Sequence, residues 1–455
     1  MKKRYRLYRI GWIFFKIFLD LRREFKLSKK KGFSFASRKM EKIHKKRAAE
    51  LFDTAVSMGG GLIKLCQYFS TRRDIFPDPY IKVLSNLQDK VPPVPFSEIK
   101  KILEEEYGGL NFPFTQVDEN PVASASIGQV HRAELRNGAI VALKIQKPGI
   151  EDIFDTDFAI LFYVFKLISH FNFFKENKDF HKVLDEFVRV TGDELNFERE
   201  IFIAKRFKKE LSKFSYITVP TVIEQFCTKK IIVMEYIKGD KITEKENWIA
   251  RNNDPRVIAK RIVEIYIEQF IFFRLIHFDP HPGNILILDN NKIALLDFGM
   301  AGEITDTMSK GIKDGIEAFL KRDYEKILLV LKKLGFIRQE ADEKKLLPLT
   351  RYFMDEIISV VKFDRESMQK INISPILKEL TEVIYSHPFQ LPWEWAYILK
   401  TTGTLVGIVS MLNPDFNIYD ELTPHFNRIV RHSLSEIIER FYESAKSAFR
   451  SIVRI

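Results

Sequence analysis

Apolar and polar positions divide the chain into a helical beginning, a strand-rich middle and a helical end. Over residues 38–70 apolar residues recur at the spacing of an α-helix, and no proline interrupts them. A second helix is predicted at about 97–107, ended by Gly108 and Gly109. The region between these helices is broken up by prolines, namely Pro77, Pro79, Pro92, Pro93 and Pro95.

From about residue 111 the pattern changes to short runs of β-forming residues. "SIGQVHRAEL" and "AIVALKIQK", separated by "RNG", predict a hairpin. A long helical stretch follows at roughly 179–211, and then two more strands in "ITVPTVIEQF" and "KKIIVMEYI". Beyond Gly239 the chain is mainly helical, apart from a small hairpin around 285–296. A sheet-rich part followed by a helix-rich part predicts two lobes with a cleft between them.

Residues 1–36 form a basic, amphipathic arm. Its apolar run from Ile10 to Leu19 is about half of the ~20 residues that span a bilayer, and Lys16 interrupts it. No small-residue cleavage site follows, so a secretory signal is not expected. Aromatic and aliphatic residues between basic flanks favour a helix that lies on an anionic membrane surface. The alternative is a solvated basic helix whose apolar face packs against the protein itself.

Charge is concentrated in the same part of the chain. The net charge is +12, whereas residues 1–50 hold 18 Lys/Arg and 4 Asp/Glu, or +14, so the remaining 405 residues sum to −2. A nucleic-acid-binding enzyme would carry basic residues through its body, and we therefore expect no nucleic-acid partner. The two cysteines, Cys66 and Cys227, exclude a disulfide scaffold and fit a reducing compartment.

Candidate chemistry is concentrated in "HFDPHPGNILILDNNKIALLDFG", residues 277–299. "ILIL" and "IALL" around the polar "DNNK" predict a tight antiparallel hairpin, which places Asn284 and Asp297 at the same end. Protein kinases build their metal floor from an H-x-D-x-x-x-x-N pattern followed by Asp-Phe-Gly. His277, Asp279, Asn284 and Asp297 take those positions here. This pattern predicts a phosphoryl-transfer site in which Asp279 acts on the accepting group and the Asn and the second Asp bind Mg²⁺.

A transition-metal site formed by His277, Asp279 and His281 is the alternative, since alternate residues share one face of a strand. Two prolines within this stretch make a regular strand unfavourable, and no further His/Cys cluster follows downstream. The amide and carboxylate oxygens described above suit Mg²⁺ better.

A loop that covers phosphate and a lysine are expected upstream. Against the pattern G-x-G-x-x-G-x-V, "ASASIGQVHRA" has Ala123, Ala125, Gly128 and Val130, so two of three glycines are replaced by alanine. "VALK" at 141–144 follows on the next strand of the hairpin and supplies Lys144 for the α/β-phosphates. The combination of loop, lysine and downstream Asp motifs is specific, although each part alone is weak.

The lysine also requires a carboxylate. Glu194, Glu198 and Glu200 in "DELNFEREIFIAKRF" are candidates, and the residues alone do not distinguish them. "KKIIVMEYIKG" predicts a hinge strand, in which backbone groups from Glu235 to Ile237 meet an adenine ring and Met234 lies at the back of the pocket. An ordinary buried strand is the alternative for this stretch.

Two features of protein kinases are missing. Phe278, not Arg, follows His277, so no arginine at that position is available to dock a phosphorylated activation loop. No A-P-E follows "DFGMAGEI", and a helix is expected from near Thr305. The platform on which a protein kinase binds a peptide is therefore not expected.

Together these motifs resemble the UbiB/ADCK family of atypical kinase-like proteins over about residues 50–420. Besides "HFDPHPGN" and "DFGMAG", three segments carry the resemblance. "KLCQYFSTRRDIFPDPYIKVLSNLQDKVPP" (64–93) is similar to the K-x-G-Q segment, "PVASASIGQVHRA" (121–133) to the alanine-rich loop, and "ELNFEREI" (194–201) to the E-x-D segment and the helix-C Glu.

The resemblance implies an α+β, two-lobed protein-kinase-like fold. Residues 111–239 are then the β-rich N-lobe and 240–455 the mostly helical C-lobe, while 37–110 form a helical N-terminal extension over the cleft, preceded by the basic arm. Within the C-lobe, 391–416 is predicted to be a core helix rather than a membrane span, because its charge-free run from Lys400 to Asp415 has only 14 residues. The C-terminal residues 433–455 are amphipathic and suit a membrane or a partner helix.

Roles for single residues follow from the resemblance. Glu200 pairs with Lys144, and Glu194 faces Lys64, which with Gln67 would have a regulatory place where ordinary kinases bind peptides. ATP or ADP is held, with Mg²⁺, by the loop, the lysine strand and the hinge: Ala123, Ser124, Ala125, Ser126, Gly128, Val130, Ala142, Lys144, Met234, Glu235 and Ile237.

The chain departs from the family pattern in three places. The K-x-G-Q glycine is Cys66, the E-x-D aspartate is Asn196, and A-A-A-S is replaced by Ala-Ser-Ala-Ser. These departures concern how the extension closes the site more than whether nucleotide binds.

The resemblance further implies a Mg²⁺-dependent ATPase or a small-molecule or lipid kinase-like activity that supports isoprenoid quinone biosynthesis at membranes. The expected partners are a membrane lipid surface, quinone-biosynthesis enzymes or lipid intermediates, and a homodimer is a further option. The expected location is cytoplasmic, peripheral to the inner or cell membrane. A nucleotide-binding pseudokinase scaffold and a true protein kinase are the alternatives.

Overall fold

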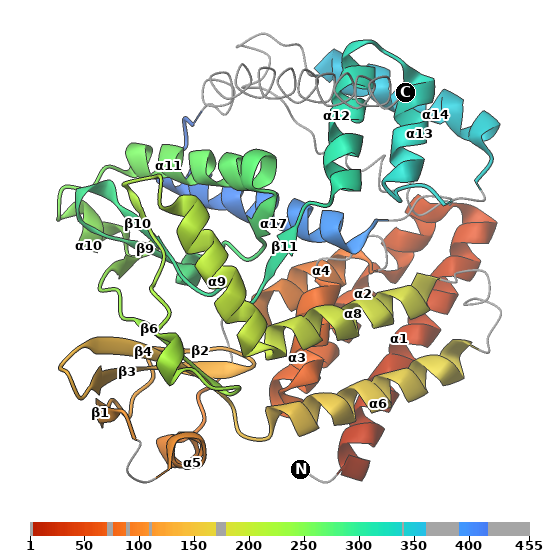
Figure 1. Ribbon diagram of the computed structural model, residues 1–455. Helices are drawn as coiled ribbons and strands as arrows, with labels where there is room; N and C mark the ends of the chain where they lie inside the picture. Colours follow the sequence, from red (N-terminus) through yellow and green to blue (C-terminus); the bar gives the residue numbers. More distant parts are fainter. Residues whose placement is uncertain are drawn as a thin grey trace, which may run out of the picture.

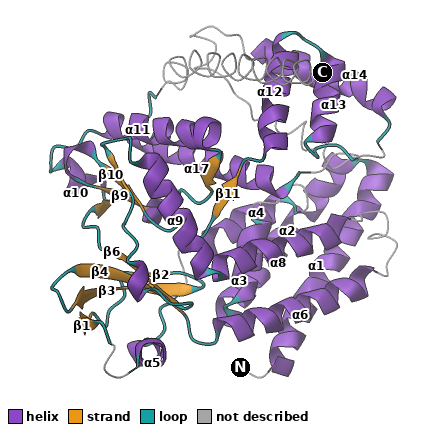
Figure 2. Ribbon diagram, in the orientation of Figure 1, coloured by secondary structure: helices purple, strands orange, loops and turns teal. Residues whose placement is uncertain are grey.

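The computed structural model describes residues 3–70, 76–87, 92–108, 112–169, 179–338, 341–360 and 391–416. Within them the chain forms a helical extension, a strand-rich N-lobe and a helical C-lobe (Figure 1). Helices make up most of the structure, and the strands gather in small sheets (Figure 2). The predicted α+β, two-lobed architecture is confirmed. The C-terminal helix predicted at 433–455 lies outside the described residues.

The first four described helices pack beside α6 (Ile150–Ser169) and α8 (Asp179–Leu195), which follow β4 in the chain (Figure 1). The four are α1 (Lys3–Lys31), α2 (Phe33–Met58), α3 (Gly61–Phe69) and α4 (Asp78–Leu84). The helical character predicted for 38–70 is confirmed, but it is divided between α2 and α3, because Gly59 and Gly60 adopt positive φ angles of 65° and 60° and end α2. Apolar periodicity continues across this break, so periodicity alone did not reveal it.

One face of α1 is part of the largest hydrophobic core. Its buried residues are Ile10, Ile13, Phe14, Ile17 and Phe18. They pack with residues of α2, α3 and the linker helix α6 (Ile150–Ser169). For this face the structure therefore shows packing against the protein itself. The side of α1 turned away from the core keeps several large apolar residues exposed.

The N-lobe is an antiparallel sheet of order β1-β3-β4-β6, with β2 added on β3. Its strands are β1 (Phe114–Val117), β2 (Ala123–Ser124), β3 (Gly128–Leu135), β4 (Ile140–Gln146) and β6 (Ile231–Glu235). The predicted hairpin is the β3–β4 pair, in which Val130 lies opposite Lys144. Helix α5 (Phe96–Tyr107) packs on the sheet through apolar residues and ends at Gly108, as predicted.

The predicted helix at 179–211 is two helices, α8 (Asp179–Leu195) and α9 (Phe197–Leu211). Asn196 lies between them, and its side-chain oxygen accepts a hydrogen bond from the Arg199 N–H at 2.9 Å. This is an N-cap, which satisfies one of the free amide groups at the start of a helix. The residue that departs from the E-x-D pattern thus begins the helix that carries Glu200.

The C-lobe holds two small sheets among helices. One has the order β5-β10-β9-β7 and the other pairs β11 with β8. The strands are β5 (Ile217–Thr218), β7 (Asp240–Lys241), β8 (Leu275–His277), β9 (Ile285–Ile287), β10 (Ile293–Leu295) and β11 (Ala301–Glu303). The helices are α10 (Lys245–Ile249), α11 (Pro255–Glu268), α12 (Asp306–Leu320), α13 (Tyr324–Lys333), α14 (Glu343–Val360) and α17 (Trp393–Leu412). The hairpin predicted at 285–296 is the β9–β10 pair.

Among the described helices, α17 alone is long and apolar enough to cross a membrane by length and composition. Its buried side packs on α11 in the C-lobe core through Ile408, Val409 and Leu412. The helix is therefore part of this lobe, as the sequence predicts.

Candidate active site

Three charged side chains from distant parts of the chain meet between the lobes. Lys144 on β4 donates from Nζ to Glu200 Oε1 on α9 at 2.6 Å and to Asp297 Oδ1, just after β10, at 2.9 Å. The Lys144 and Glu200 side chains are 10% and 4% exposed, whereas that of Asp297 is 37% exposed. The structure thus selects Glu200 from the three candidate glutamates and leaves Asp297 open to a ligand.

Burial and charge act against each other in this cluster. Burial lowers the pKa of Lys144, but the charges of Asp297 and Glu200 outweigh it and raise that pKa above its ordinary value. Burial would raise the pKa of Asp297, yet the charge of Lys144 and hydrogen bonds from Lys144 and Gly299 hold it well below its usual range. For Glu200 burial dominates and raises the pKa to about 7. A raised pKa for the lysine and a lowered pKa for Asp297 favour the charged forms of both, which suits the binding of phosphate and Mg²⁺.

The β9–β10 hairpin brings Asn284 and Asp297 together. The Leu296 N–H donates to the Asn284 carbonyl at 2.9 Å, which closes the hairpin at the end where both residues lie. Asn284 Nδ2 donates to the Asp279 carbonyl at 3.2 Å. The amide oxygen of Asn284 is therefore the atom left to bind a ligand. One amide oxygen and one carboxylate form a hard donor set, so these residues fit Mg²⁺.

The His277 side chain forms hydrogen bonds through both ring nitrogens. Its Nε2 lies 2.6 Å from the Asp297 carbonyl and its Nδ1 lies 3.2 Å from the Tyr266 hydroxyl. Because a carbonyl can only accept, Nε2 carries the hydrogen and Nδ1 accepts from Tyr266. Both ring nitrogens are occupied, so His277 is no metal ligand. Among the described residues no group of three or more His, Cys, Asp or Glu side chains could hold a metal ion, and the transition-metal alternative fails.

Asp297 and Phe298 have the backbone and packing of an ordered Asp-Phe-Gly segment. Asp297 has a φ of 57°, and the Gly299 N–H donates to its Oδ1 at 3.1 Å. The Phe298 ring packs on Phe207 of α9 and on His277, with ring centroids 5.1 Å and 5.6 Å apart. These ring contacts join α9, which carries Glu200, to β8, which ends at His277. The residues that follow β8, 278–284, are called the catalytic loop below, after the corresponding loop of protein kinases.

The alanine-rich loop is a closed turn between β2 and β3. Ala123 pairs with Val130, and the Ala125 N–H donates to the Gly128 carbonyl at 2.8 Å. That N–H is therefore not free for phosphate. Gly128 has a packing role, since a Cβ there would lie 2.7 Å from the Ile145 carbonyl oxygen of β4. The Ser124 hydroxyl is buried and forms no hydrogen bond with the described residues, and the Ser126 side chain is buried too.

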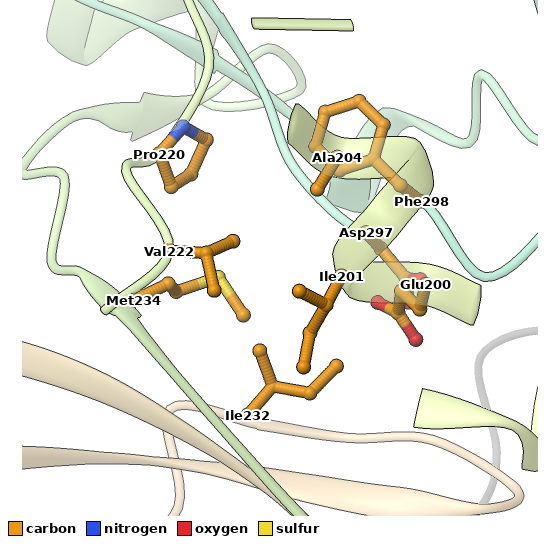
Figure 3. Close-up of a pocket in the computed structure, with 9 residues that line it drawn as sticks. All are labelled: Glu200, Ile201, Ala204, Pro220, Val222, Ile232, Met234, Asp297 and Phe298. Atoms are coloured by element: carbon orange, nitrogen blue, oxygen red, sulfur yellow. The ribbon is translucent and has the colours of Figure 1, made fainter. Parts of the chain in front are cut away.

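The hinge side is lined by Ala142 of β4 and Met234 of β6, which lie opposite each other. The Glu235 carboxylate turns outward and accepts from Thr221 Oγ1 at 2.8 Å, and the Glu235 N–H donates to the Thr221 carbonyl at 2.8 Å. The Glu235 N–H is therefore not free for adenine, and the contact predicted for Glu235 and Ile237 would have to use other backbone groups of this segment. A small, mainly apolar pocket is bordered on one side by Glu200 and Asp297 (Figure 3). It is lined by Glu200, Ile201, Ala204, Pro220, Val222, Ile232, Met234, Asp297 and Phe298.

The extension approaches the site through α3. Lys64 of α3 forms an ion pair with Glu194 of α8, as the resemblance implies, and both side chains are largely buried. Gln67 Nε2 donates to the Leu87 carbonyl at 3.3 Å and so holds the 3-10 turn Ser85–Leu87 that follows α4. The buried Cys66 packs in the extension core. Helix α3 is thereby fixed against the helix that precedes α9.

Helix α17 supplies residues that the sequence analysis did not identify. The Lys400 ammonium lies 3.5 Å from Asp279 Oδ1, and Thr401 Oγ1 donates to the Phe278 carbonyl at 2.8 Å. The Tyr397 ring stacks on Phe278 at 5.7 Å. The only signal in the sequence was a lysine placed at the start of a charge-free run. Nothing in that pattern showed which loop the lysine would meet.

Phe278 takes the position where protein kinases have arginine. It is 4% exposed and belongs to the core shared with the extension. Gly302 of β11 lies against its ring, and a Cβ at Gly302 would be 2.0 Å from the Phe278 ring. The position therefore serves apolar packing between the catalytic loop, α17 and the extension.

Comparison with known proteins places this site in context. A match to the family described as "ABC1: ABC1 atypical kinase-like domain" covers residues 86–331. The chain is 34% identical to an uncharacterized protein in hydrogenase 1 5'region of Clostridium pasteurianum, over 87% of this chain and 73% of that protein. It is 31% identical to Protein ACTIVITY OF BC1 COMPLEX KINASE 3, chloroplastic, of Arabidopsis thaliana, over 88% of this chain and 56% of that protein. The chain thus spans little more than half of the Arabidopsis relative.

The fold is also similar to a solved structure, "The complex structure of Rv3197-erythromycin from Mycobacterium tuberculosis". The TM-score is 0.50 and the sequence identity 24%, over 82% of this chain and 94% of that one. At this identity the likeness concerns the fold alone.

Proposed function

We propose, since this chain belongs to the ABC1 atypical kinase-like family, that it is a Mg²⁺-dependent atypical kinase or ATPase that binds ATP or ADP. The observation that carries the proposal is the meeting of Lys144, Glu200 and Asp297, with Asn284 beside them. Lys144 would orient the α/β-phosphates while Glu200 holds the lysine in place. Mg²⁺, when bound by Asn284 and Asp297, would neutralise phosphate charge. Asp279 would accept a proton from the attacking group or orient it.

Two alternatives are weighed by the same residues. A pseudokinase scaffold does not need all the residues of a phosphoryl-transfer site. The joint presence of those residues therefore favours ATP turnover; they are Lys144, Glu200, Asp279, Asn284 and Asp297. A protein kinase is disfavoured because Phe278 is a packing residue and the chain enters α12 directly after β11. The Thr305 side chain caps that helix at the Met308 N–H, which leaves no long activation segment.

The substrate side of the proposal concerns isoprenoid quinone biosynthesis at a membrane. It is supported by the resemblance and by the exposed side of α1. Large apolar residues recur there at intervals of three and four, namely Tyr5, Tyr8, Trp12, Phe15 and Leu19. Exposed basic residues accompany them, namely Arg4, Arg9, Arg23, Lys26, Lys29, Lys30 and Lys31. We take this α1 face to contact anionic lipid, with the protein cytoplasmic and peripheral to the membrane and acting with pathway enzymes or lipid intermediates.

ATP hydrolysis tests the enzymatic part. Wild type and Asp297→Asn are compared with and without anionic vesicles and a phenolic mimic of a quinone precursor. We expect lipid-stimulated hydrolysis in the wild type and its loss in the variant. Asp289→Asn, on the exposed turn of the same hairpin, is the control and should keep the wild-type rate. Nucleotide binding without turnover would favour the scaffold, and phosphorylated protein would favour the protein kinase.

Vesicle sedimentation tests the membrane part separately. The double variant Trp12→Ser/Phe15→Ser should bind phosphatidylserine vesicles more weakly than the wild type, and salt should weaken binding further. Phe202→Ser removes an aromatic residue that is 60% exposed on α9 and should bind as the wild type does. Equal binding by all three proteins would remove the α1 face from the proposal.

A further inference from the structure

Helix α17 lies against the catalytic loop through successive contacts along one of its sides. Tyr397 stacks on Phe278, Lys400 reaches the Asp279 carboxylate, and Thr401 bonds the Phe278 carbonyl. Lys400 and Glu394 are the only charged residues within α17. A charged side chain on an otherwise apolar helix is unfavourable unless it finds solvent or a partner, and the Lys400 side chain is only 18% exposed.

The other basic side chains near Asp279 have different partners. They are Lys64, His277 and His281. Lys64, however, is paired with Glu194, and both nitrogens of His277 are occupied. The His281 Nδ1 accepts from the Gly283 N–H at 3.1 Å and so caps the turn before Asn284.

Within the described residues Lys400 is thus the cation that contacts the Asp279 carboxylate itself. An ammonium group 3.5 Å from one carboxylate oxygen restricts rotation of the carboxylate about its last bond. The backbone of the same residue is fixed independently by Asn284, whose amide donates to its carbonyl.

We propose that Lys400 is a positioning residue for the reaction: it orients the Asp279 carboxylate from α17 and so couples the docking of this helix to turnover. This inference rests on the proposed function, since it assigns a role at that site. It implies that the charge at position 400 matters for the chemical step and not for nucleotide binding, because Lys400 contacts none of the residues proposed to hold nucleotide or Mg²⁺. A small misplacement of a catalytic group is enough to slow such a step.

Kinetics of position-400 variants test the role. Lys400→Met keeps the length of the side chain and removes the charge, and we expect kcat to fall roughly tenfold or more while KM for ATP and the thermal shift with Mg·ADP stay unchanged. Lys400→Arg should recover most of kcat. Lys245→Met is the matched control, because Lys245 donates to the Met411 carbonyl at the far end of α17, and its kcat should equal that of the wild type. Wild-type kcat in Lys400→Met, or an equal loss in both Lys→Met variants, would overturn the proposal.

A second measurement keeps the test decisive if the wild type binds nucleotide but does not hydrolyse it. Tm is measured for Lys400→Met, Asp279→Asn and the double variant. If Lys400 holds Asp279, the change in Tm caused by Lys400→Met should differ by about 2 °C or more between the two backgrounds. Equal Tm changes in the two backgrounds would show that Lys400 and Asp279 do not interact. The role proposed for Lys400 would then be wrong, whether or not the protein hydrolyses ATP. Absence of hydrolysis with a clear coupling would instead count against the proposed function.

Discussion

At the scale of single residues, the alanine-rich loop shows how a few methyl groups change a phosphate-binding turn. The Ala125 N–H is used within the turn, and Gly128 lies too close to β4 to be replaced. A glycine loop leaves such N–H groups free to approach phosphate, since glycine lacks a Cβ and tolerates positive φ. We therefore expect the loop of this chain to hold a triphosphate less closely than a glycine loop does, which suits the proposed ATPase better than a protein kinase.

Replacing Ala125 with glycine should change nucleotide affinity by roughly threefold or more, and raise self-phosphorylation, because the turn can open toward the phosphates. Affinity is measured by titration with Mg·ADP and self-phosphorylation by intact mass. Ala139→Gly, at the opposite end of the β3–β4 hairpin, should leave both unchanged. No change in either quantity for Ala125→Gly would contradict this account of the loop.

Lys147 gives a pH dependence that can be checked without activity. It lies just beyond β4, donates to the Pro92 carbonyl at 3.1 Å, and burial lowers its pKa from 10.5 to about 8. The unfolded chain therefore binds more protons than the folded chain between about pH 8 and 10.5. In that window the stability of the wild type should rise relative to Lys147→Met, and the Tm difference should be constant below it. A Tm difference that does not vary from pH 7 to pH 10 would contradict this.

At the scale of elements, breaks between helices decide where Lys64 and Glu194 lie. The Gly59–Gly60 break turns α3 so that Lys64 meets Glu194, and the Asn196 cap separates α8 from α9. The sequence predicts helix in all four segments because their apolar residues keep the helical spacing. It missed both breaks, since a glycine pair or an asparagine also occurs inside continuous helices, and only tertiary contacts decide between the two outcomes.

Substitution of Gly60 tests the first break. Gly60→Ala places a Cβ 2.3 Å from Ile153 Cγ2, in addition to the strain of a φ of 60°. Gly59→Ala has a φ of 65° and no atom within 4 Å of its Cβ, so it carries only the backbone strain, about 1 kcal/mol. Gly60→Ala should therefore lower the free energy of unfolding by a further ~1–3 kcal/mol, measured in urea. Equal effects of the two variants would show that the α3 contact with α6 is not tight.

At the scale of the whole molecule, the extension is held by long-range contacts. Arg6 of α1 forms a bidentate ion pair with the fully buried Asp157 of α6, with Nη2 2.6 Å from Oδ2, and also donates to the Met58 and Gly59 carbonyls. One residue thereby ties the first helix, the end of the second and the N-lobe linker. Helix α1, which makes up most of the predicted arm at 1–36, therefore packs against the helices that follow it in the chain.

Breaking this pair should be costly. Arg6→Met leaves a buried carboxylate without its counter-ion and should lower the free energy of unfolding by about 3–5 kcal/mol. Lys45→Met disrupts the exposed pair with Glu41 and should cost about 0.5 kcal/mol or less. Adding Asp157→Leu to Arg6→Met should restore part of the loss, because no charge then remains buried. The prediction fails if the single Arg6 variant unfolds like the wild type in urea.

The family motifs made much of the site predictable. Their spacing in "VALK", "HFDPHPGN" and "DFG" assigns Lys144, Asp279, Asn284 and Asp297, and short-range patterns suffice to place them on strands and turns. Glu200 required the resemblance, since the helix offers three glutamates. Lys400 and the Arg6–Asp157 pair could not be predicted, because their partners are 121 and 151 residues away in the chain and no local pattern encodes such a meeting.

Phe278 has a consequence for how such a protein can be controlled. A protein kinase with arginine at this position can be activated by phosphorylation of its activation loop and inactivated by a phosphatase. In this protein the Phe278 ring instead packs against Gly302, Tyr397 and the hydrophobic core of the extension. At Phe278 the loop 278–284 therefore has no arginine that could bind a phosphorylated segment. We expect control of the proposed activity to act instead through the packing of α17 and the extension against this ring.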